Sequence, residues 1–440
     1  MITVFTEKIT PRIKYIFSLI FVDVLGTQVT FTTDESIFED TSANILNYSK
    51  RRVNRGVTII PSDLLLESDI FEQEIYVEKY EGVPVFFSTQ GNSALPFDPF
   101  SAAFYLVTRY EEYLPYIPDE HGRFPPSESL AYKEGFLEIP VVNLWARMVK
   151  NKMVAVYPEI EFNPPAFSFK STIDIDNLYA YRSKGGFRTI GGFLKDLSSL
   201  SFRNAWHRLL TILSIEKDPY DTLDLQAQMV EEMGFGCQYF MLFSSFGQFD
   251  RNVPFYSHSM HAAVKGINDF APVGIHPSYK SNQNEATLEK EIKGLEHVLN
   301  VPVRRSRQHF LMLRFPSTYR NLMKFGIRED YSMGYASELG FRAGIAHPFD
   351  FYDLEMEVKR PLKIFPFQVM EGALMYHKQT PVSKAWPLIK AQIDAVKSVD
   401  GMYVSVWHNR IFSEEEPEWR GWTGLYRKMI SYAQSENPQE

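Results

Sequence analysis

Between residues 166 and 434, short apolar runs alternate with longer amphipathic stretches, and this alternation constrains the fold more than any other feature of the chain. Strands connected by helices of ~10–16 residues usually pair in parallel. We therefore expect a (β/α) barrel or a doubly wound sheet in this part of the chain. The runs expected as strands are 167–175, 239–243, 273–275, 362–367 and 402–407, and the stretches expected as helices are 222–233, 285–300, 318–325 and 383–399.

The stretch 285–300 shows the clearest helical pattern. Its apolar residues Leu288, Ile292, Leu295 and Leu299 recur at the spacing of one helix face, while Glu and Lys occupy the other face. Glycines directly after 222–233 and after 318–325 are typical helix stop signals. These patterns predict helices between the strands.

The length of 440 residues favours more than one domain, because a single hydrophobic core rarely grows that large. Three prolines between 158 and 165 interrupt regular structure and indicate a boundary. We expect a smaller α/β domain at 1–157 and the alternating unit at 166–434. Within 1–157 the sequence predicts strands at 57–60 and 83–87 and helices at 98–110 and 145–154, but no converging chemical groups and no role.

Charge, cysteine content and the length of apolar runs argue against several classes of protein. The net charge is −8 and no basic run occurs, which disfavours a nucleic-acid partner. The single cysteine cannot form an internal disulfide, so nothing requires an oxidising compartment. The apolar run 16–22 is too short to span a membrane and is better explained as a core element than as a signal peptide. We therefore expect a cytoplasmic protein with no membrane span.

Aromatic residues make up 15% of the chain, which is a high proportion. Planar rings can stack on sugar rings, but they also fill ordinary hydrophobic cores. The core explanation is favoured, and carbohydrate binding stays open.

Polar side chains follow four of the expected strands. Asp174 and Asp176 end the first one, His276 and His408 end later ones, and His309 closes the stretch 303–310, the fourth expected strand. Catalytic groups of (β/α) barrels come from several such strand ends. The period of two along a strand places both carboxylates on one side, where two like charges require a cation or a shared proton. Since His is the commonest metal ligand, an Asp/His metal site is predicted, and an exposed carboxylate pair that caps the next element is the alternative.

His258 and His261 lie three residues apart and could share a helix face. No expected strand end lies beside them to direct their rings toward the other polar groups. An ordinary helix start is therefore favoured over a ligand pair at this position.

Five short segments together resemble the motifs of the polysaccharide deacetylases, the NodB-homology family. They are 171–176, 274–279, 306–309, the pair 330–335 and 340–344, and 406–409. Their order and spacing over roughly 166 to 410 carry the resemblance, because each motif alone is weak. The resemblance implies a distorted (β/α) barrel of the polysaccharide-deacetylase type, and residues 1–157 resemble an extra domain that precedes this barrel in some bacterial members.

The resemblance also implies catalytic roles for three residues. Asp174 matches the catalytic base, Arg307 matches the arginine that holds this base, and His408 matches the general acid. Substrate contacts are expected at Ser278, Tyr279 and Asp330.

The metal ligands implied by the resemblance are Asp176 and His276, and one position departs from the family pattern. The second motif usually carries another His four residues after the first, where this chain has Lys280. A protonated amine has no lone pair to offer a metal. His309 is the candidate substitute. Zinc is the expected divalent metal, with cobalt or nickel as alternatives.

The function expected from these features is metal-dependent removal of an acetyl group from an acetylated sugar or polysaccharide precursor. Two alternatives remain. The loss of a ligand at Lys280 is compatible with a catalytically retired carbohydrate-binding protein. A barrel of this type could also hydrolyse another non-peptide C–N bond.

Overall fold

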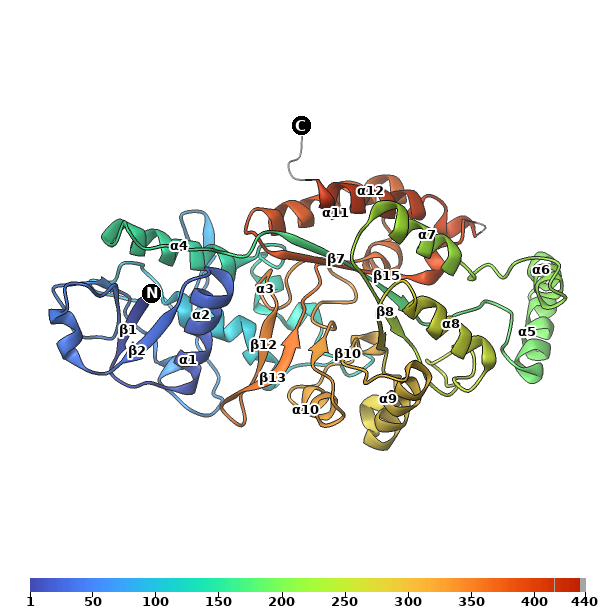
Figure 1. Cartoon of the computed structure of the whole chain (residues 1–440), viewed down its shortest axis with the longest axis horizontal. Coiled ribbons are helices and arrows are strands. Elements are labelled where there is room, and N and C mark those ends of the chain that lie inside the picture. Colours follow the sequence, from blue (N-terminus) through green and yellow to red (C-terminus); the bar gives the residue numbers. More distant parts are fainter. Residues whose placement is uncertain (415, 436–440) are drawn as a thin grey trace.

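The computed structural model describes residues 1–414 and 416–435, apart from the side chains of 187, 203 and 204. Two sheets dominate it, one of four strands near the N-terminus and one of nine strands in the rest of the chain. Figure 1 shows the four-stranded sheet at one end of the molecule, the larger sheet in the middle, and a pair of helices at the opposite end.

The N-terminal part contains a parallel sheet in the order β2-β1-β3-β4 with helices packed against it. A short antiparallel pair, β5 and β6, follows in the chain. The elements are β1 (Ile2–Thr6), α1 (Pro11–Ser18), a π-helical turn (Leu19–Val24), β2 (Val29–Thr32), β3 (Ile45–Tyr48), β4 (Val57–Thr58), β5 (Glu78–Tyr80), β6 (Val83–Val85), α2 (Pro99–Val107), α3 (Leu130–Lys133) and α4 (Val141–Val156).

The larger sheet has the order β12-β13-β11-β10-β9-β8-β7-β15-β14, and all neighbours except β12 and β13 are parallel. Its elements are β7 (Ser168–Ile175), α5 (Gly186–Ser198), α6 (Phe202–Ile212), α7 (Leu223–Met233), β8 (Cys237–Met241), α8 (His258–Asn268), β9 (Val273–Ile275), α9 (Glu285–Leu299), β10 (Arg305–Ser306), α10 (Ser317–Lys324), β11 (Glu329–Asp330), β12 (Phe349–Asp353), β13 (Val358–Ile364), β14 (Val369–Met370), α11 (Val382–Lys397), β15 (Met402–His408) and α12 (Trp422–Gln434).

The predicted alternation of parallel strands and helices is confirmed, whereas closure into a barrel is not shown. The hydrogen-bonded series runs from β12 to β14, and these two end strands do not pair with each other in the described residues. The antiparallel strand β12 was not predicted. Helices α7, α11 and α12 lie along one side of β7 and β15, and α8, α9 and α10 accompany the strands from β8 onward (Figure 1).

Most predicted helices and strands occur within a few residues of their expected bounds. Helix α9 has the predicted position, and Gly234 ends α7 in the left-handed conformation that glycine adopts easily. The apolar run 16–22 lies in α1 and the following turn, and five of its seven residues are buried, as a core element should be, whereas Val22 is exposed. His258 begins α8, in agreement with the expected helix start.

The strand predicted at 362–367 begins four residues earlier, at Val358. Its first half is largely exposed and pairs with β12, so its burial pattern does not resemble that of a core strand. The exposed half therefore gave no apolar signal in the sequence.

The N-terminal part packs closely on the larger sheet, and one continuous hydrophobic core includes residues from both. A buried ion-pair network also connects them. Glu112 accepts hydrogen bonds from Arg109 at 2.7 Å and from Arg342 at 2.7 and 2.9 Å, and the three side chains are at most 3% exposed. The boundary between 158 and 165 has no helix or strand, and separate folding of 1–157 stays a prediction.

Gly274 in the middle of β9 brings two strands unusually close. A Cβ added here would lie 2.7 Å from the carbonyl oxygen of Arg305 and 2.9 Å from the ring of Phe240. Only glycine fits without movement of the backbone, so this residue fixes the spacing of the strands just before His276.

In the described part of the chain, no helix combines the length and apolar character needed to cross a bilayer.

Candidate metal centre

The side chains predicted from strand ends meet around one cavity of about 260 Å³ at the carboxyl ends of β7, β9 and β15. The lining includes carboxylates, imidazoles and guanidinium groups from six separated segments of the chain. The polar lining residues are Glu120, His121, Arg123, Asp174, Asp176, His276, Gln308, His309, Tyr376, His377, His408 and Arg410.

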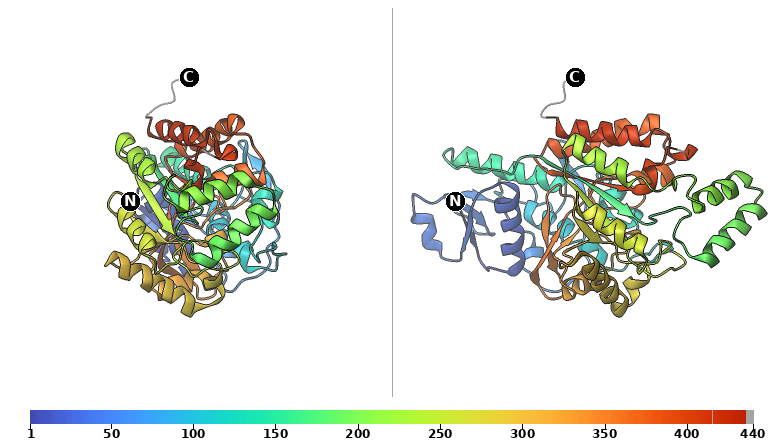
Figure 2. Two further views of the ribbon diagram at one scale, coloured as in Figure 1. Left: turned by 90° about the vertical axis from the view of Figure 1, so that its right-hand side faces the viewer. Right: turned by 45° about the vertical axis from the view of Figure 1, so that its right-hand side comes forward.

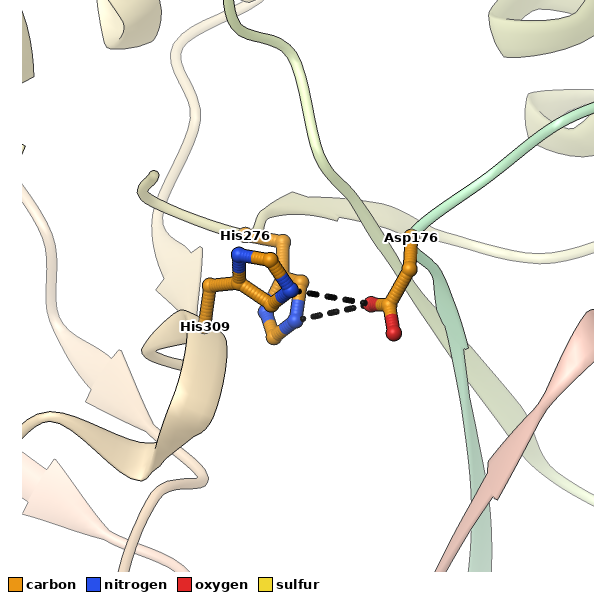
Figure 3. Close-up of side chains that lie close together, drawn as sticks. All are labelled: Asp176, His276 and His309. Carbon is orange, nitrogen blue, oxygen red and sulfur yellow. Dashed lines mark ion pairs between the residues drawn. The ribbon is translucent and has the colours of Figure 1, made fainter. Parts of the chain in front are cut away.

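Three of these residues form a group with the chemistry of a metal site. One donor atom from each of Asp176, His276 and His309 lies within 4.8 Å of the others. Figure 3 shows both imidazoles directed at the same oxygen of Asp176, with Nε2 of His276 at 3.2 Å and Nε2 of His309 at 3.8 Å from Oδ1. Two imidazole nitrogens and one carboxylate oxygen are a ligand set that zinc commonly uses in sites with an open position.

The other nitrogen of each ring is held by a hydrogen bond. Nδ1 of His276 donates to the carbonyl oxygen of Arg307 at 2.5 Å, and Nδ1 of His309 donates to Oδ1 of Asp250 at 2.9 Å. In neutral rings these bonds place the protons on Nδ1 and leave the Nε2 lone pairs facing Asp176. Metal-binding histidines are usually oriented in this way.

The oxygen between the two imidazoles has no hydrogen-bond donor. Oδ1 of Asp176 is buried and accepts no hydrogen bond from the described residues. Burial opposes ionisation of this carboxyl, but the charged forms of His408, then His276 and His309, hold its pKa well below its usual range. When the rings are neutral and present their Nε2 lone pairs, this positive charge and the donor from His276 are missing. A buried ionised oxygen without a donor needs a cation, so the residues fit a divalent metal.

Asp174 lies beside this group and is oriented by a buried arginine. Nη1 of Arg307 donates to Oδ1 of Asp174 at 2.9 Å, and Nε donates to the carbonyl oxygen of Tyr331 at 2.9 Å. The guanidinium also stacks 4.7 Å from the ring centre of Phe240. The second oxygen of Asp174 lies 3.9 Å from Nε2 of His276, so this carboxylate faces the cavity with one oxygen free.

His408 approaches from the opposite side of the cavity. Its Nδ1 bonds to Oε1 of the fully buried Glu371 at 2.5 Å, and its Nε2 lies 3.5 Å from Oδ2 of Asp176. Burial lowers the pKa of this imidazole, but Glu371 and Asp176 outweigh burial and raise it to about 9. Arg410 adds a second positive charge, with Nη1 3.9 Å from Asp176.

Residues 119–123 of the N-terminal part contribute to the cavity wall, although the sequence of 1–157 gave no sign of converging chemistry. Nη1 of Arg123 donates to the carbonyl oxygen of Phe310 at 2.6 Å, and Nε pairs with Asp119 at 2.7 Å. Phe310 directly follows His309 and has a φ of 59°, which is uncommon for a bulky residue. Arg123 therefore fixes the strained backbone next to a candidate ligand, and His121 packs edge-on against Phe310.

The predicted substrate contacts lie outside the lining of this cavity. Asp330 is fully buried and accepts hydrogen bonds from Ser306 and Ser332. Ser278 and Tyr279 line a neighbouring cavity of about 420 Å³ instead. Substrate binding by these three residues stays a prediction.

Lys280, the departure from the family pattern, is exposed and also lines the neighbouring cavity rather than the Asp/His group. His309 lies where the group needs a second imidazole. The chain therefore supplies its second His from the loop after β10 and not from the position after His276.

Sequence reasoning missed Asp250, Glu371 and Arg410. Glu371 directly follows β14, so the rule that located the other strand-end residues would have found it if this two-residue strand had been recognised. Asp250 lies in the long loop after β8, and no spacing relates it to His309. The contribution of Arg123 depends on contacts between distant parts of the chain, which no local pattern indicates.

Comparison with known families identified one match. Residues 2–158 match the model of a family of unknown function, DUF7033. No curated protein matched the chain.

Several solved structures are similar to part of this chain. One is a proposed polysaccharide deacetylase from Mycobacterium smegmatis, with 13% identity, a TM-score of 0.40, and coverage of 63% of this chain and 87% of that one. Another is a CE4 family pseudoenzyme from Bacillus anthracis, with 10% identity, a TM-score of 0.31, and coverage of 61% and 60%. A 4-α-glucanotransferase from Thermococcus litoralis matches with 12% identity, a TM-score of 0.36, and coverage of 62% and 38%.

Proposed function

We propose that this protein is a metal-dependent hydrolase that removes an acetyl group from an acetylated sugar or polysaccharide precursor. The observation that carries the proposal is the buried Oδ1 of Asp176, which faces two oriented imidazoles and lacks a hydrogen-bond donor. The carboxyl group of Asp174, held by Arg307, and an imidazole held by Glu371 flank this point. A metal site between a base and an acid is the arrangement that amide or ester hydrolysis uses.

Asp176, His276 and His309 would hold the metal, with zinc expected first and cobalt or nickel as alternatives. A bound divalent metal supplies Lewis acidity toward the acetyl carbonyl and toward water. The proton transfers would be carried out by the side chains around the metal.

Asp174 would accept the proton of the attacking water through its free oxygen. The hydrogen bond from Arg307 fixes the direction of this carboxyl group. His408 would donate a proton from Nε2 to the leaving amine or hydroxyl, while Glu371 holds the other ring nitrogen. The base and the acid therefore reach the cavity from different strands, β7 and β15.

The first test is metal content by elemental mass spectrometry. Wild type is expected to carry zinc, cobalt or nickel near one equivalent, and Asp176→Ala and His309→Gln are expected to lose it. His258→Gln serves as the control, because this imidazole is exposed on another helix and should not affect metal content. Wild type that stays metal-free after supply of all three metals would contradict the proposal and favour a retired carbohydrate-binding protein.

The second test is acetate release from a panel of N- and O-acetylated sugars. Asp174→Asn should abolish turnover while retaining the metal, since Asn cannot act as a base but can still accept a hydrogen bond from Arg307. Unchanged turnover in this variant would remove Asp174 from the mechanism. Metal without acetate release, combined with hydrolysis of another C–N substrate, would favour the other hydrolase class.

A further inference from the structure

Helices α5 and α6 form a hairpin that stands away from the rest of the molecule. Figure 1 shows it at the end opposite the N-terminal sheet, and the right-hand view of Figure 2 shows it separated from the body along most of its length. The hairpin is inserted between β7 and α7 and begins ten residues after Asp176. It therefore leaves the same sheet edge that carries the candidate metal centre.

The large apolar side chains of this hairpin face outward. Ile190, Leu194 and Leu197 recur at helical spacing on α5, and Phe202, Trp206 and Leu209 do so on α6. Such a stripe normally faces a core, but here all six side chains are exposed, with Ile190 at 62%, Phe202 at 64% and Trp206 at 59%. The turn between the helices adds Leu200, which is 74% exposed.

The contact between the two helices includes small and polar groups. Nε of Arg208 donates to Asp196 at 2.7 Å, and these side chains are only 12% and 14% exposed. Ala205 is buried, and a Cβ at Gly192 would lie 2.5 Å from Arg208. The described contact between the helices is thus partly polar, while large apolar side chains that normally face a core are exposed.

The charge of the hairpin differs from that of the chain. Residues 186–212, the two helices and their turn, include four Lys or Arg and one Asp, whereas the whole chain has a net charge of −8. Asp196 pairs with Arg208, and the flanking Arg182 and Lys217 pair with Asp221 and Asp224 beyond the hairpin. The hairpin therefore combines outward apolar side chains with a small excess of positive charge, in which Lys195 is exposed.

We propose that the α5–α6 hairpin binds the surface of an anionic lipid bilayer, with Leu200, Phe202 and Trp206 among the side chains that enter the interface. Amphipathic helices with aromatic and aliphatic residues on one face and Lys or Arg beside them bind membranes in this way. A second copy of the chain fits less well, because two hairpins meeting face to face would oppose like charges. The proposal requires no spanning helix and does not rest on the proposed deacetylase activity.

The test is cosedimentation of the full-length protein with vesicles of phosphatidylcholine alone or with about one third phosphatidylglycerol. Binding is expected to the anionic vesicles, weaker on neutral ones, and reduced by high salt, which screens the lysines and arginines. The triple variant Leu194→Ser, Leu200→Ser, Trp206→Ser should lose roughly tenfold or more of the partition coefficient, because the apolar area that enters the interface is removed. The matched control is Tyr76→Ser, Ile117→Ser, Met356→Ser, which removes equally exposed apolar side chains elsewhere.

A second variant, Lys195→Glu, changes charge without removing apolar surface and should weaken binding to anionic vesicles only. Circular dichroism and size-exclusion chromatography of every variant establish that the fold and the oligomeric state are unchanged. The proposal is overturned if wild type does not bind anionic vesicles, or if the hairpin and control variants bind equally well. A wild-type dimer that ignores vesicles and dissociates in the triple variant would assign the surface to a second copy instead.

Discussion

Protonation of one buried histidine should weaken the contact between the N-terminal part and the larger sheet. Nδ1 of His347 lies 2.8 Å from the amide nitrogen of Asn143 on α4. The amide oxygen of Asn143 already accepts the N–H of Ala346 at 2.9 Å, so its NH₂ group faces the ring. Nδ1 must therefore act as an acceptor, and a proton on it would face a donor in a nearly closed environment.

The size of the effect follows from the pKa of this imidazole. Burial, with a smaller contribution from Arg147, lowers it from 6.5 to about 4. Above pH 6.5 neither the folded nor the unfolded chain is protonated here, and stability is unaffected. Between the folded-state pKa of about 4 and the unfolded-state pKa of 6.5, only the unfolded chain binds the proton. The free energy of unfolding therefore falls as the pH falls, by about 2 kcal/mol at about pH 5 and by about 3 kcal/mol below pH 4.

The assay is urea unfolding of wild type and His347→Gln between pH 5 and pH 7.5. Carboxylates titrate in the same range and affect both proteins. The informative quantity is therefore the difference in the free energy of unfolding between wild type and His347→Gln as a function of pH. This difference should shift by about 2 kcal/mol in favour of the variant as the pH falls, because glutamine cannot be protonated. His258→Gln, an exposed substitution, provides the control. A difference that stays constant to within about 0.5 kcal/mol would refute the reasoning.

Three further substitutions test other contacts. Glu112→Gln should destabilise the fold by roughly 3–5 kcal/mol in urea unfolding, because two buried guanidinium groups lose their counter-charge. The surface variant Glu128→Gln is the control, and an equal loss of stability in both variants would contradict this prediction. Asp250→Ala should lower zinc affinity about 10–100-fold in competition with a chromophoric chelator, since His309 loses its orienting partner, and unchanged affinity would argue against His309 as a ligand. Arg123→Ala should lower zinc affinity by about tenfold or less through the loosened backbone beside His309, whereas Arg147→Ala, which breaks an exposed pair, should not.

The sequence predicted the repeating part of the fold well because burial there follows regular periods. Helix α9 exposes one face and buries the other, and β15 is buried along nearly its whole length, so both carry strong apolar patterns. The two-residue strands β10, β11 and β14 carry no such pattern. They exist because their longer neighbours present a hydrogen-bonding edge, which is a property of the assembled sheet.

The candidate site was predictable to the extent that its residues follow strands. The carboxyl ends of parallel strands meet at one edge, so Asp174, His276 and His408 could be placed together without a structure. The groups that orient them could not be placed in the same way. Arg123 reaches the cavity from the N-terminal part, and Glu371 contacts His408 from the end of a short strand, so their positions depend on how distant segments pack.

The position of Lys280 distinguishes two explanations of the departure from the family pattern. Either the chain has lost a ligand at this position, or His309 serves as the second imidazole instead. If the chain had lost a ligand there, restoring histidine should strengthen metal binding. The structure directs this side chain elsewhere, because the chain turns into a short helical segment, Lys280–Gln283, that lines the neighbouring cavity. We therefore expect Lys280→His to leave zinc content and affinity unchanged, His309→Gln to lose zinc, and the double variant to lose it equally. Elemental analysis and chelator competition measure all three, and recovery of zinc in the double variant would show that the site can be completed from position 280.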